Sequence, residues 1–423
     1  MHMRKSVLGL LPRADRLPLA TLVVAICLAG CGAPAAKFHS NLVFVHRKER
    51  ESKTEFTPQQ LTDVTNILTG LFGTPDEPHL PATGELDTSK LIDLDRVKMS
   101  AGAVASDKHG QPAGLYREHC VHCHGITGDG MGPTAAFLNP YPRDYRKGIF
   151  KFKSTEKGQR PTHDDLKRIV LEGVAGTAMP SFKVLDMDEV ESLVHYVKFL
   201  AIRGEVERRL ADEVVELEEN ERLIINPSEK DKDAAKFQEK LDKVRGIVND
   251  VMQAWIDAET QAVQITGRPA GWELDRDALK KSQARGRELF YGTIANCSKC
   301  HGDSALGDGV LNDFDDWTKE LDPADPTAVK EYQSLGALSP RNIRPRNLRM
   351  GIFRGGRRPI DIYWRIANGI DGTPMPAVPK KPANEKGLDP DDIWALVDYV
   401  LSLPYETTSP RDAHQPTVVR ERL

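Results

Sequence analysis

The fold of this chain is decided by two short stretches, Cys120-Val121-His122-Cys123-His124 and Cys297-Ser298-Lys299-Cys300-His301. Both have the form C-x-x-C-H. Chance produces roughly 0.002 such matches in a chain of this composition, so a pair of them needs a physical cause. The two remaining cysteines, Cys27 and Cys31, lie near the N-terminus.

The spacing C-x-x-C-H is the attachment pattern of c-type haem. Positions i, i+3 and i+4 of a helical turn share one face, so two thioether bonds can hold the porphyrin edge while the histidine reaches the iron. We therefore predict two covalently attached haem c groups, bound by Cys120, Cys123, His124, Cys297, Cys300 and His301. The alternatives are a disulfide within each stretch, a thioredoxin-like redox pair, or one four-cysteine zinc site.

An internal repeat surrounds the two stretches. Residues 142–150 (PRDYRKGIF) correspond to 345–353 (PRNLRMGIF), and a Met-Pro loop follows each, at 176–180 and 372–376. An amphipathic helix is predicted after each loop, with one apolar face made of Val190, Leu193, Val194, Val197 and Leu200, then of Ile393, Leu396, Val397, Val400 and Leu401. The chain thus contains one module twice.

The Met-Pro loops predict the second axial ligand of each iron. A residue before proline is pushed into an extended conformation, which suits a loop that crosses a haem face. Methionine offers a flexible thioether, and a Met/His pair raises the potential of haem iron. We predict Met179 and Met375 as iron ligands opposite His124 and His301. The rival candidates are Met131, Met187 and Met350, of which Met350 is the best placed.

Each module resembles a class I cytochrome c, and the likeness covers residues 113–203 and 282–405, so that the two haem domains are predicted at 113–203 and 282–408. The resemblance implies a mainly α fold with two haem domains. It also implies that the carbonyl of a Gly-Pro pair, here Gly132-Pro133, accepts a hydrogen bond from the proximal histidine. The second module lacks this proline. By the same resemblance, Arg143 and Arg346 are expected to contact haem propionates.

The N-terminal 30 residues have the layout of a secretory signal peptide. Four basic residues precede the apolar run 17–29, and small residues lead to Cys31. The end of this segment resembles the lipobox of bacterial lipoproteins, which implies that Cys31 carries a lipid. The alternative is an uncleaved anchor helix. Either origin predicts a protein that is membrane-anchored on the periplasmic side, outside the cytoplasm.

The other segments show no catalytic signature. Residues 31–112 are predicted to be a tether with one short helix, capped by Thr57 and ended by Gly73. Residues 204–281 are predicted to be a charged helical linker with antiparallel helices near 205–224 and 229–264, and residues 409–423 a tail. The net charge of −4 argues against a nucleic-acid binder with a dominant basic surface.

Two basic stripes, residues 143–168 and 341–365, flank the haem motifs. They are expected either to neutralise propionates or to dock an acidic redox partner from a respiratory chain. We expect an electron-transfer protein, alone or as a subunit of a larger complex. A dihaem cytochrome c peroxidase is the alternative, but peroxide chemistry needs an open iron face and both modules keep a Met-Pro loop.

Overall fold

The computed structural model describes residues 35–82, 84, 86–218, 221–224, 233–265, 267–268, 275–309, 313–381 and 383–406. The predicted signal peptide 1–30, the lipidation residue Cys31 and the predicted tail 409–423 lie outside the described residues. The fold is mainly helical, as expected, with two short antiparallel strand pairs. The described residues from Lys37 onward belong to one compact unit.

The N-terminal segment and the first module contain the elements α2 (Leu42–Ser52), α3 (Pro58–Phe72), α4 (Leu94–Ser100), β1 (Ala105–Ser106), β2 (Pro112–Ala113), α5 (Leu115–His119), α6 (Val121–His124), η1 (Ala135–Phe137), η2 (Tyr145–Lys147), α7 (His163–Glu172) and α8 (Met187–Val215). The strands β1 and β2 pair with Ala105 opposite Ala113.

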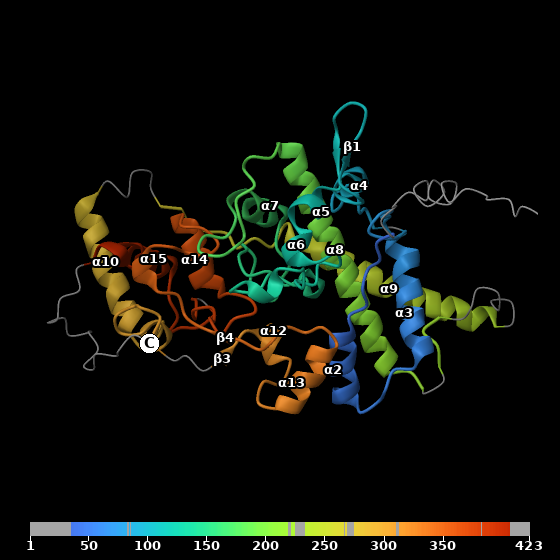
Figure 1. Cartoon of the computed structure of the whole chain (residues 1–423). Coiled ribbons are helices and arrows are strands. Elements are labelled where there is room, and N and C mark those ends of the chain that lie inside the picture. The colour runs from blue at the N-terminus through green and yellow to red at the C-terminus, as the bar shows by residue number, and fades with distance from the viewer. Residues whose placement is uncertain are drawn as a thin grey trace, which may run out of the picture. The chain divides into compact units, whose positions relative to one another are not determined.

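The linker and the second module contain α9 (Ala234–Ala258), α10 (Arg276–Tyr291), α11 (Ser298–His301), β3 (Asp313–Phe314), α12 (Asp316–Lys319), α13 (Pro326–Ser334), β4 (Asn342–Ile343), η5 (Leu348–Met350), α14 (Pro359–Asn368), α15 (Pro390–Ser402) and η6 (Leu403–Tyr405). The strands β3 and β4 pair with Asp313 opposite Ile343. Figure 1 shows α10, α14 and α15 gathered in one group, apart from the group around α5–α8.

The closing helix of each module buries its predicted face. In α8 the residues Val190, Leu193, Val194, Val197 and Leu200 are all buried. In α15 the residues Ile393, Leu396, Val397 and Val400 are buried, and Leu401 is half-buried. This agrees with the periodicity, because residues three and four apart share one side of a helix.

Helix α10 packs against α15 at very short range. A Cβ atom added at Gly286 would lie 1.9 Å from the carbonyl oxygen of Ala395, so only glycine allows the two backbones to approach this closely. Phe290, which is fully buried, packs edge-on against Tyr399 at a centroid distance of 5.5 Å. This crossing holds the C-x-x-C-H turn of the second module.

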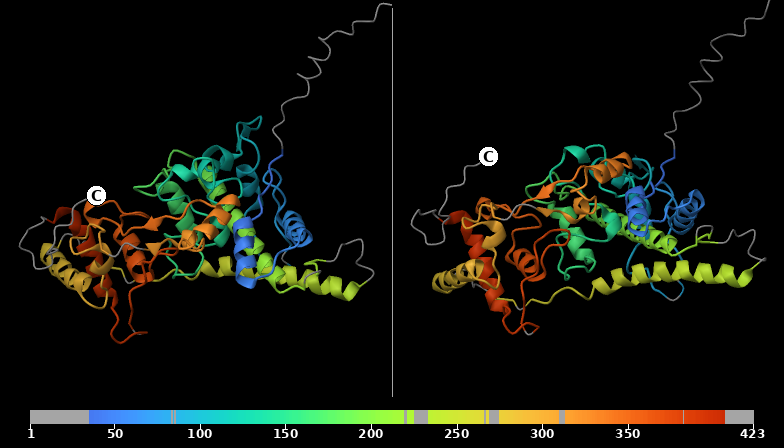
Figure 2. Two further views of the ribbon diagram at one scale, coloured as in Figure 1. Left: turned by 60° about the horizontal axis from the view of Figure 1, so that its bottom comes forward. Right: turned by 90° about the horizontal axis from the view of Figure 1, so that it is seen from below.

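The linker differs from the predicted pair of separate helices. Helix α8 continues without a break from the first module to Val215, because Val206, Leu210 and Val214 extend its buried face. Helix α9 then returns antiparallel, with Lys243 paired to Glu213 and the indole N–H of Trp255 donating to Glu205. Figure 2 shows α9 as one long helix. The predicted helix boundaries 205–224 and 229–264 were therefore wrong, while the antiparallel arrangement is confirmed.

The predicted tether is more structured than expected. Helix α3 is confirmed, with its Thr57 cap and Gly73 end, but α2 and α4 were missed. Helix α2 was overlooked because its charged sequence has only one fully buried residue, Phe44. It is held by tertiary contacts instead: Arg208 lies 3.9 Å from the centre of the Phe44 ring, and the Asn41 N–H donates to Glu207 of α8.

Residues 313–343 form an excursion that lengthens the second module. Its small core of Leu321, Ala328 and Tyr332 is joined by Val43 of α2. Arg50 pairs with Glu331 at 2.8 Å across this contact. Figure 1 shows α13 next to α2. The excursion therefore connects the second module to the N-terminal segment. Within the described residues, no helix combines the length and apolarity that crossing a bilayer requires.

Candidate haem sites

Both C-x-x-C-H stretches form a single helical turn. The His124 N–H donates to the Cys120 carbonyl and the His301 N–H to the Cys297 carbonyl, each at 2.9 Å. Gly125 and Gly302 end these turns at φ of +71° and +78°. The four cysteines are free of disulfides. Each pair of thiols therefore lies one turn apart, as two thioether bonds to one porphyrin require.

A glycine backs each turn at the same place. A Cβ atom at Gly132 would lie 2.4 Å from the carbonyls of Val121 and His122, and one at Gly309 would lie 2.5 Å from those of Lys299 and Cys300. The loop after each motif therefore packs directly on the turn. Gly132 has this packing role and not the hydrogen-bonding role expected for the Gly132-Pro133 pair.

The histidines are oriented by a different carbonyl from the one that the resemblance implied. His124 Nδ1 lies 3.1 Å from the carbonyl oxygen of Arg143, and His301 Nδ1 lies 3.0 Å from that of Arg346. The expectation for Gly132-Pro133 was thus wrong. A carbonyl only accepts, so Nδ1 donates and Nε2 keeps a lone pair for iron. Burial lowers the pKa of His124 to about 4, which favours this neutral ring.

The sequence carries a signal for this contact. The Pro-Arg pair recurs as 142–143 and 345–346, 18 residues after His124 and 44 after His301. A repeat that survives such different spacing indicates a contact that both modules need. It also explains how the second module orients His301 without a Gly-Pro pair.

The two Met-Pro loops have the same backbone geometry. The Thr177 hydroxyl donates to the Val174 carbonyl and accepts from the Met179 N–H, and Thr373 does the same with Ile370 and Met375. Met179 and Met375 are partly buried against the cores of their own modules. The rivals Met187 and Met350 are 51% and 58% exposed. The matched loops agree with ligation by Met179 and Met375, which stays a prediction.

The donor set fits haem c better than the alternatives. Burial raises the pKa of Cys120 and of Cys297 to about 12, which disfavours the thiolates that zinc needs. No cysteine takes part in a potential metal-binding cluster within the described part of the chain. The Tyr145 ring stacks on His124 at 4.7 Å. The residues present thus supply two thiols, an oriented imidazole and a thioether loop per site.

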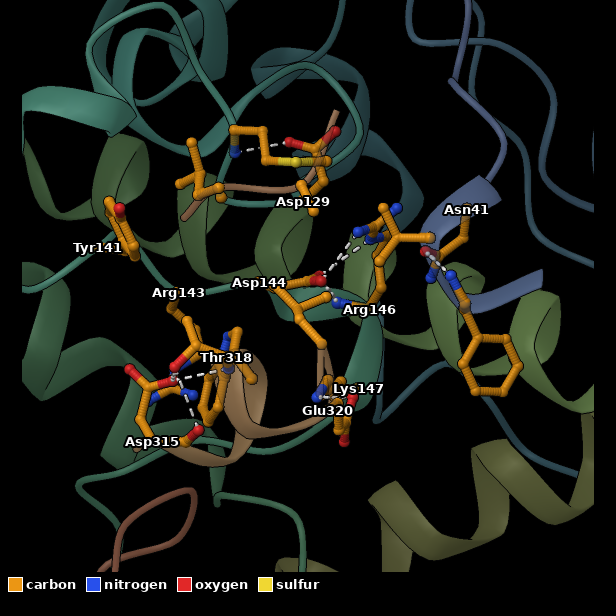
Figure 3. Close-up of a pocket in the computed structure, with 18 of the residues that line it drawn as sticks. Asn41, Asp129, Tyr141, Arg143, Asp144, Arg146, Lys147, Asp315, Thr318 and Glu320 are labelled. Atoms are coloured by element: carbon orange, nitrogen blue, oxygen red, sulfur yellow. Dashed lines mark hydrogen bonds and ion pairs between the residues drawn. The ribbon is translucent and has the colours of Figure 1, made fainter. Parts of the chain in front are cut away.

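Arg143 fits the expected contact with a propionate. Among the described residues its Nη1 is buried with no hydrogen-bond partner, which leaves a donor for an anionic group. Burial lowers the pKa of this guanidinium to about 9. Figure 3 shows Arg143 above Asp315 and Thr318 of the excursion. Arg346 differs, because its Nε donates to the Ile352 carbonyl at 3.0 Å and its Nη2 lies against Gly176.

Many cations of the basic stripes are paired within the chain. The pairs are Arg146–Asp144, Lys147–Glu320, Lys153–Asp371, Arg160–Glu205, Arg349–Glu406 and Arg358–Asp361. These side chains neutralise internal carboxylates, so they contribute less to an outward-facing basic surface than the sequence suggests.

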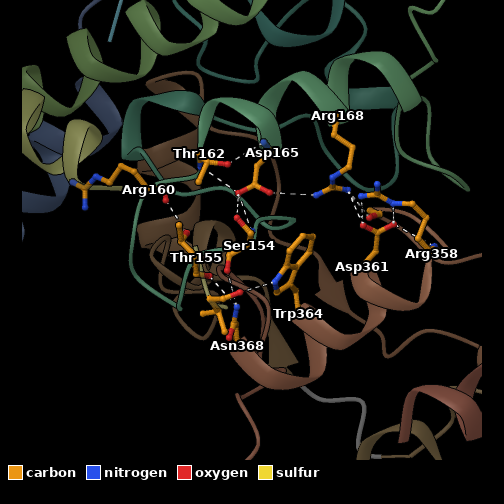
Figure 4. A network of polar contacts seen from close by, with 12 residues as sticks. Ser154, Thr155, Arg160, Thr162, Asp165, Arg168, Arg358, Asp361, Trp364 and Asn368 are labelled. Carbon is orange, nitrogen blue, oxygen red and sulfur yellow. Dashed lines mark hydrogen bonds and ion pairs between the residues drawn. The ribbon is translucent and has the colours of Figure 1, made fainter. Parts of the chain in front are cut away.

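The two modules meet through the segments that build their haem sites. Asn368 of α14 donates to the carbonyls of Ser154 and Thr155, and Arg168 of α7 donates to Gly355. Figure 4 shows this network, in which Arg168 also reaches Asp361. Asp371, next to the second Met-Pro loop, accepts from the Gly158 N–H. The two modules therefore pack directly against each other, which the sequence could not establish.

A cluster of His163, Glu191 and His195 was not predicted. Its ligand atoms lie within 4.8 Å of one another. However, Glu191 is already paired with Lys167, and the Asp93 N–H donates to His195 Nδ1. That bond leaves the proton of the neutral imidazole on Nε2, which removes the lone pair a metal would use. The cluster is an ion-pair network that joins α4, α7 and α8.

Comparison with known proteins agrees with this geometry. Residues 107–197 match the family model of cbb3-type cytochrome c oxidase subunit III, and residues 283–404 match the cytochrome c family model. The protein is a dihaem c-type cytochrome. Its two cytochrome c domains imply two covalently bound haem c groups with iron, and they indicate a function in electron transfer.

Other comparisons add little about this cytochrome. No curated protein matches it. A chain of the reducing HAO-like protein complex of Kuenenia stuttgartiensis is similar over 71% of this chain and 99% of its own length, with 22% identity and a TM-score of 0.42. A likeness at this level supports no conclusion about function.

Proposed function

We propose that this cytochrome carries electrons between redox proteins outside the cytoplasm while a lipid on Cys31 holds it at a membrane. The charged head, the short apolar run and the small residues before Cys31 support the anchor. The partners proposed are members of a respiratory chain, and the cytochrome works alone or as a subunit of a larger complex.

The observation that carries the proposal is that each module contains both an oriented histidine and a Met-Pro loop with the same hydrogen bonds. When bound, haem c supplies an iron that changes by one electron. If Met179 and Met375 ligate the irons as predicted, neither iron keeps an open position, and such a site favours outer-sphere transfer over substrate binding.

The contact between the modules supports transfer in series. The backbone carbonyls of Arg143 and Arg346 orient the two histidines, and the Arg346 side chain also packs on the Met-Pro loop of the first module. Gly176 meets Arg346 directly, and Asp371 beside the second loop pairs with Lys153. These contacts place protein between the two sites, through which electrons can pass from one haem to the other.

Rapid-mixing kinetics of the purified holoprotein test the proposal. We expect an artificial reductant to reduce both haems, and a soluble oxidant protein to reoxidise them, without turnover of hydrogen peroxide. Rapid peroxide turnover by the reduced protein would replace electron carriage by the peroxidase alternative. If the partner is acidic, the rate of electron transfer to it should fall as the salt concentration rises, because salt screens the electrostatic attraction that guides the two proteins together.

Cell fractionation tests the anchor separately. Cys31→Ala should move the haem-loaded protein from the membrane to the soluble periplasmic fraction. A protein that remains with the membrane after this change would favour the uncleaved anchor helix.

A further inference from the structure

Trp317 lies in the excursion that lengthens the second module, and it contacts the first haem site. The centre of its ring is 3.6 Å from the Arg143 guanidinium carbon and 5.1 Å from Lys147 Nζ. Arg143 is the residue whose carbonyl orients His124. The ring therefore covers the side chain of a residue that builds the first site.

The same ring contacts the second site. A Cβ atom added at Gly372 would lie 2.0 Å from Cζ3 of Trp317, so the indole packs directly on the backbone of the loop that carries Met375. Gly372 has a φ of +68°, which favours glycine independently. One aromatic side chain thus fills the space between Arg143 of the first site and the Met375 loop of the second.

In the part of the chain that the structure describes, the opposite contact between the modules lacks such a ring. Gly176 of the first Met-Pro loop meets the Arg346 guanidinium itself, at 2.4 Å from an added Cβ. The arrangement is reciprocal, but only the second module has the excursion that inserts an aromatic residue. The two sites are therefore inequivalent although the same ligand set is predicted for both.

We propose that Trp317 is a positioning residue that couples the two haem sites by holding Arg143 against the first and the Met375 loop against the second. The indole attracts the Arg143 cation and shields it from water, so the charge of Arg143 is screened less than that of an exposed guanidinium. A nearby cation favours the reduced iron, and a firmly held methionine raises the potential. The proposal rests on the proposed electron-transfer function and assigns its tuning.

The first test is a redox titration of Trp317→Leu. Water then reaches Arg143 and the Met375 loop loosens, so both midpoint potentials should fall. We expect the reduced-to-oxidised ratio of at least one haem to change tenfold, which is 59 mV for one electron. Trp317→Phe keeps a ring and should restore most of both potentials. The single variants Met179→His and Met375→His, made in the otherwise wild-type protein, each change one predicted axial ligand. The midpoint potential that shifts in each variant is thereby assigned to the first or the second site.

Tyr141→Leu is the matched control. Tyr141 stacks on Arg341 at 3.8 Å and bonds to the Ser339 carbonyl, so its loss removes a similar contact between the excursion and the first module. It should leave the second potential unchanged. A Trp317→Leu protein with both haems attached in which either potential equals that of the wild type would overturn the proposal.

A double-mutant cycle covers the case in which Trp317→Leu folds poorly. Gly372→Ala should displace the indole and shift the potential of the first haem, although the change lies in the second module. In the Trp317→Leu background the same change should leave the first haem unaffected. An equal shift in both backgrounds contradicts coupling through the ring. Absorbance verifies that each variant carries both haems. A failure of the proposed function would instead show as rapid peroxide turnover by the reduced wild-type protein, so the two failures are distinguishable.

Discussion

At the scale of single residues, the two haem sites are built by the same few contacts. A backbone carbonyl orients each histidine, a glycine backs each C-x-x-C-H turn, and a threonine hydroxyl braces each Met-Pro loop. These contacts recur although the intervening loops differ in length. The chemistry of the ligands therefore constrains the chain more strongly than the loops between them.

Met375→Ala should lower the potential of the second haem, because a thioether ligand favours the reduced iron. It should also allow carbon monoxide to bind the reduced iron at that site. Potentiometric titration and carbon monoxide difference spectra measure both effects. Met350→Ala is the control and should leave them unchanged, since Met350 is 58% exposed. The reverse pattern would assign the ligand to Met350.

At the scale of elements, close helix crossings and buried polar clusters position the sites. The crossing of α10 and α15 depends on Gly286, and the His195 cluster joins α4, α7 and α8. Helix α9 covers α8 and satisfies the buried Glu205 through Trp255. Each of these contacts lies outside the haem motifs but fixes a helix of the scaffold around them.

Gly286→Ala should destabilise the second module. The new Cβ atom would lie 1.9 Å from a backbone oxygen, so α10 must move away from α15, at a net cost of about 1–3 kcal/mol. Gly246→Ala in α9 is the control, because nothing lies within 4 Å of its added Cβ atom. It should stabilise the protein by about 0.5–1 kcal/mol through helix propensity. Thermal unfolding should give a melting temperature below that of the wild type for Gly286→Ala and above it for Gly246→Ala.

The His195 cluster should make stability depend on pH. Burial, together with His163 and Lys198, lowers the pKa of His195 from 6.5 to about 4. The neutral ring is therefore preferred in the folded state, and this contribution is complete above pH 6.5 and is lost as the pH falls toward 4. Because His195 is partly exposed and water screens its charge, we expect the free energy of unfolding to fall by about 1–2 kcal/mol across this pH range.

His195→Gln tests the pH effect. Glutamine can still accept from the Asp93 N–H but does not titrate, so the variant should lose less stability than the wild type between neutral and acidic pH. Urea unfolding of the variant and the wild type, each at neutral and at acidic pH, measures how much stability each protein loses. An identical loss in the two proteins would show that other groups cause the acid sensitivity.

At the scale of the whole molecule, an ion pair between the modules keeps the two sites adjacent. Lys153 of the first module and Asp371 of the second lie 2.9 Å apart, with side chains only 4% and 5% exposed. Asp371→Ala would leave a buried ammonium without its partner, which should cost about 3–5 kcal/mol. It should also slow equilibration between the haems, measured after rapid partial reduction.

The control for this contact is an exposed pair between the same modules. Lys380 and Glu156 are 3.2 Å apart, with side chains 31% and 63% exposed. Glu156→Ala should cost about 0–1 kcal/mol because water screens the charges. If Asp371→Ala and Glu156→Ala lowered the free energy of unfolding equally, burial of the Lys153–Asp371 pair would not add to its contribution to stability.

The sequence by itself determined the features that depend on short spacings: the two C-x-x-C-H turns, the repeated module, and the buried faces of α8 and α15. One helical turn or one amphipathic face is a local geometry, so a few neighbouring residues suffice to specify it. The expected ligands fall on matched elements for the same reason.

Only the tertiary structure decided which carbonyl orients each histidine, where α8 ends, how α2 is held, and which partners the stripe arginines take. These outcomes join residues far apart in the chain, such as His301 with Arg346 or Trp317 with both Arg143 and Gly372. The burial and charge pairing that stabilise these contacts exist only once the modules have packed. A local sequence pattern therefore does not predict them.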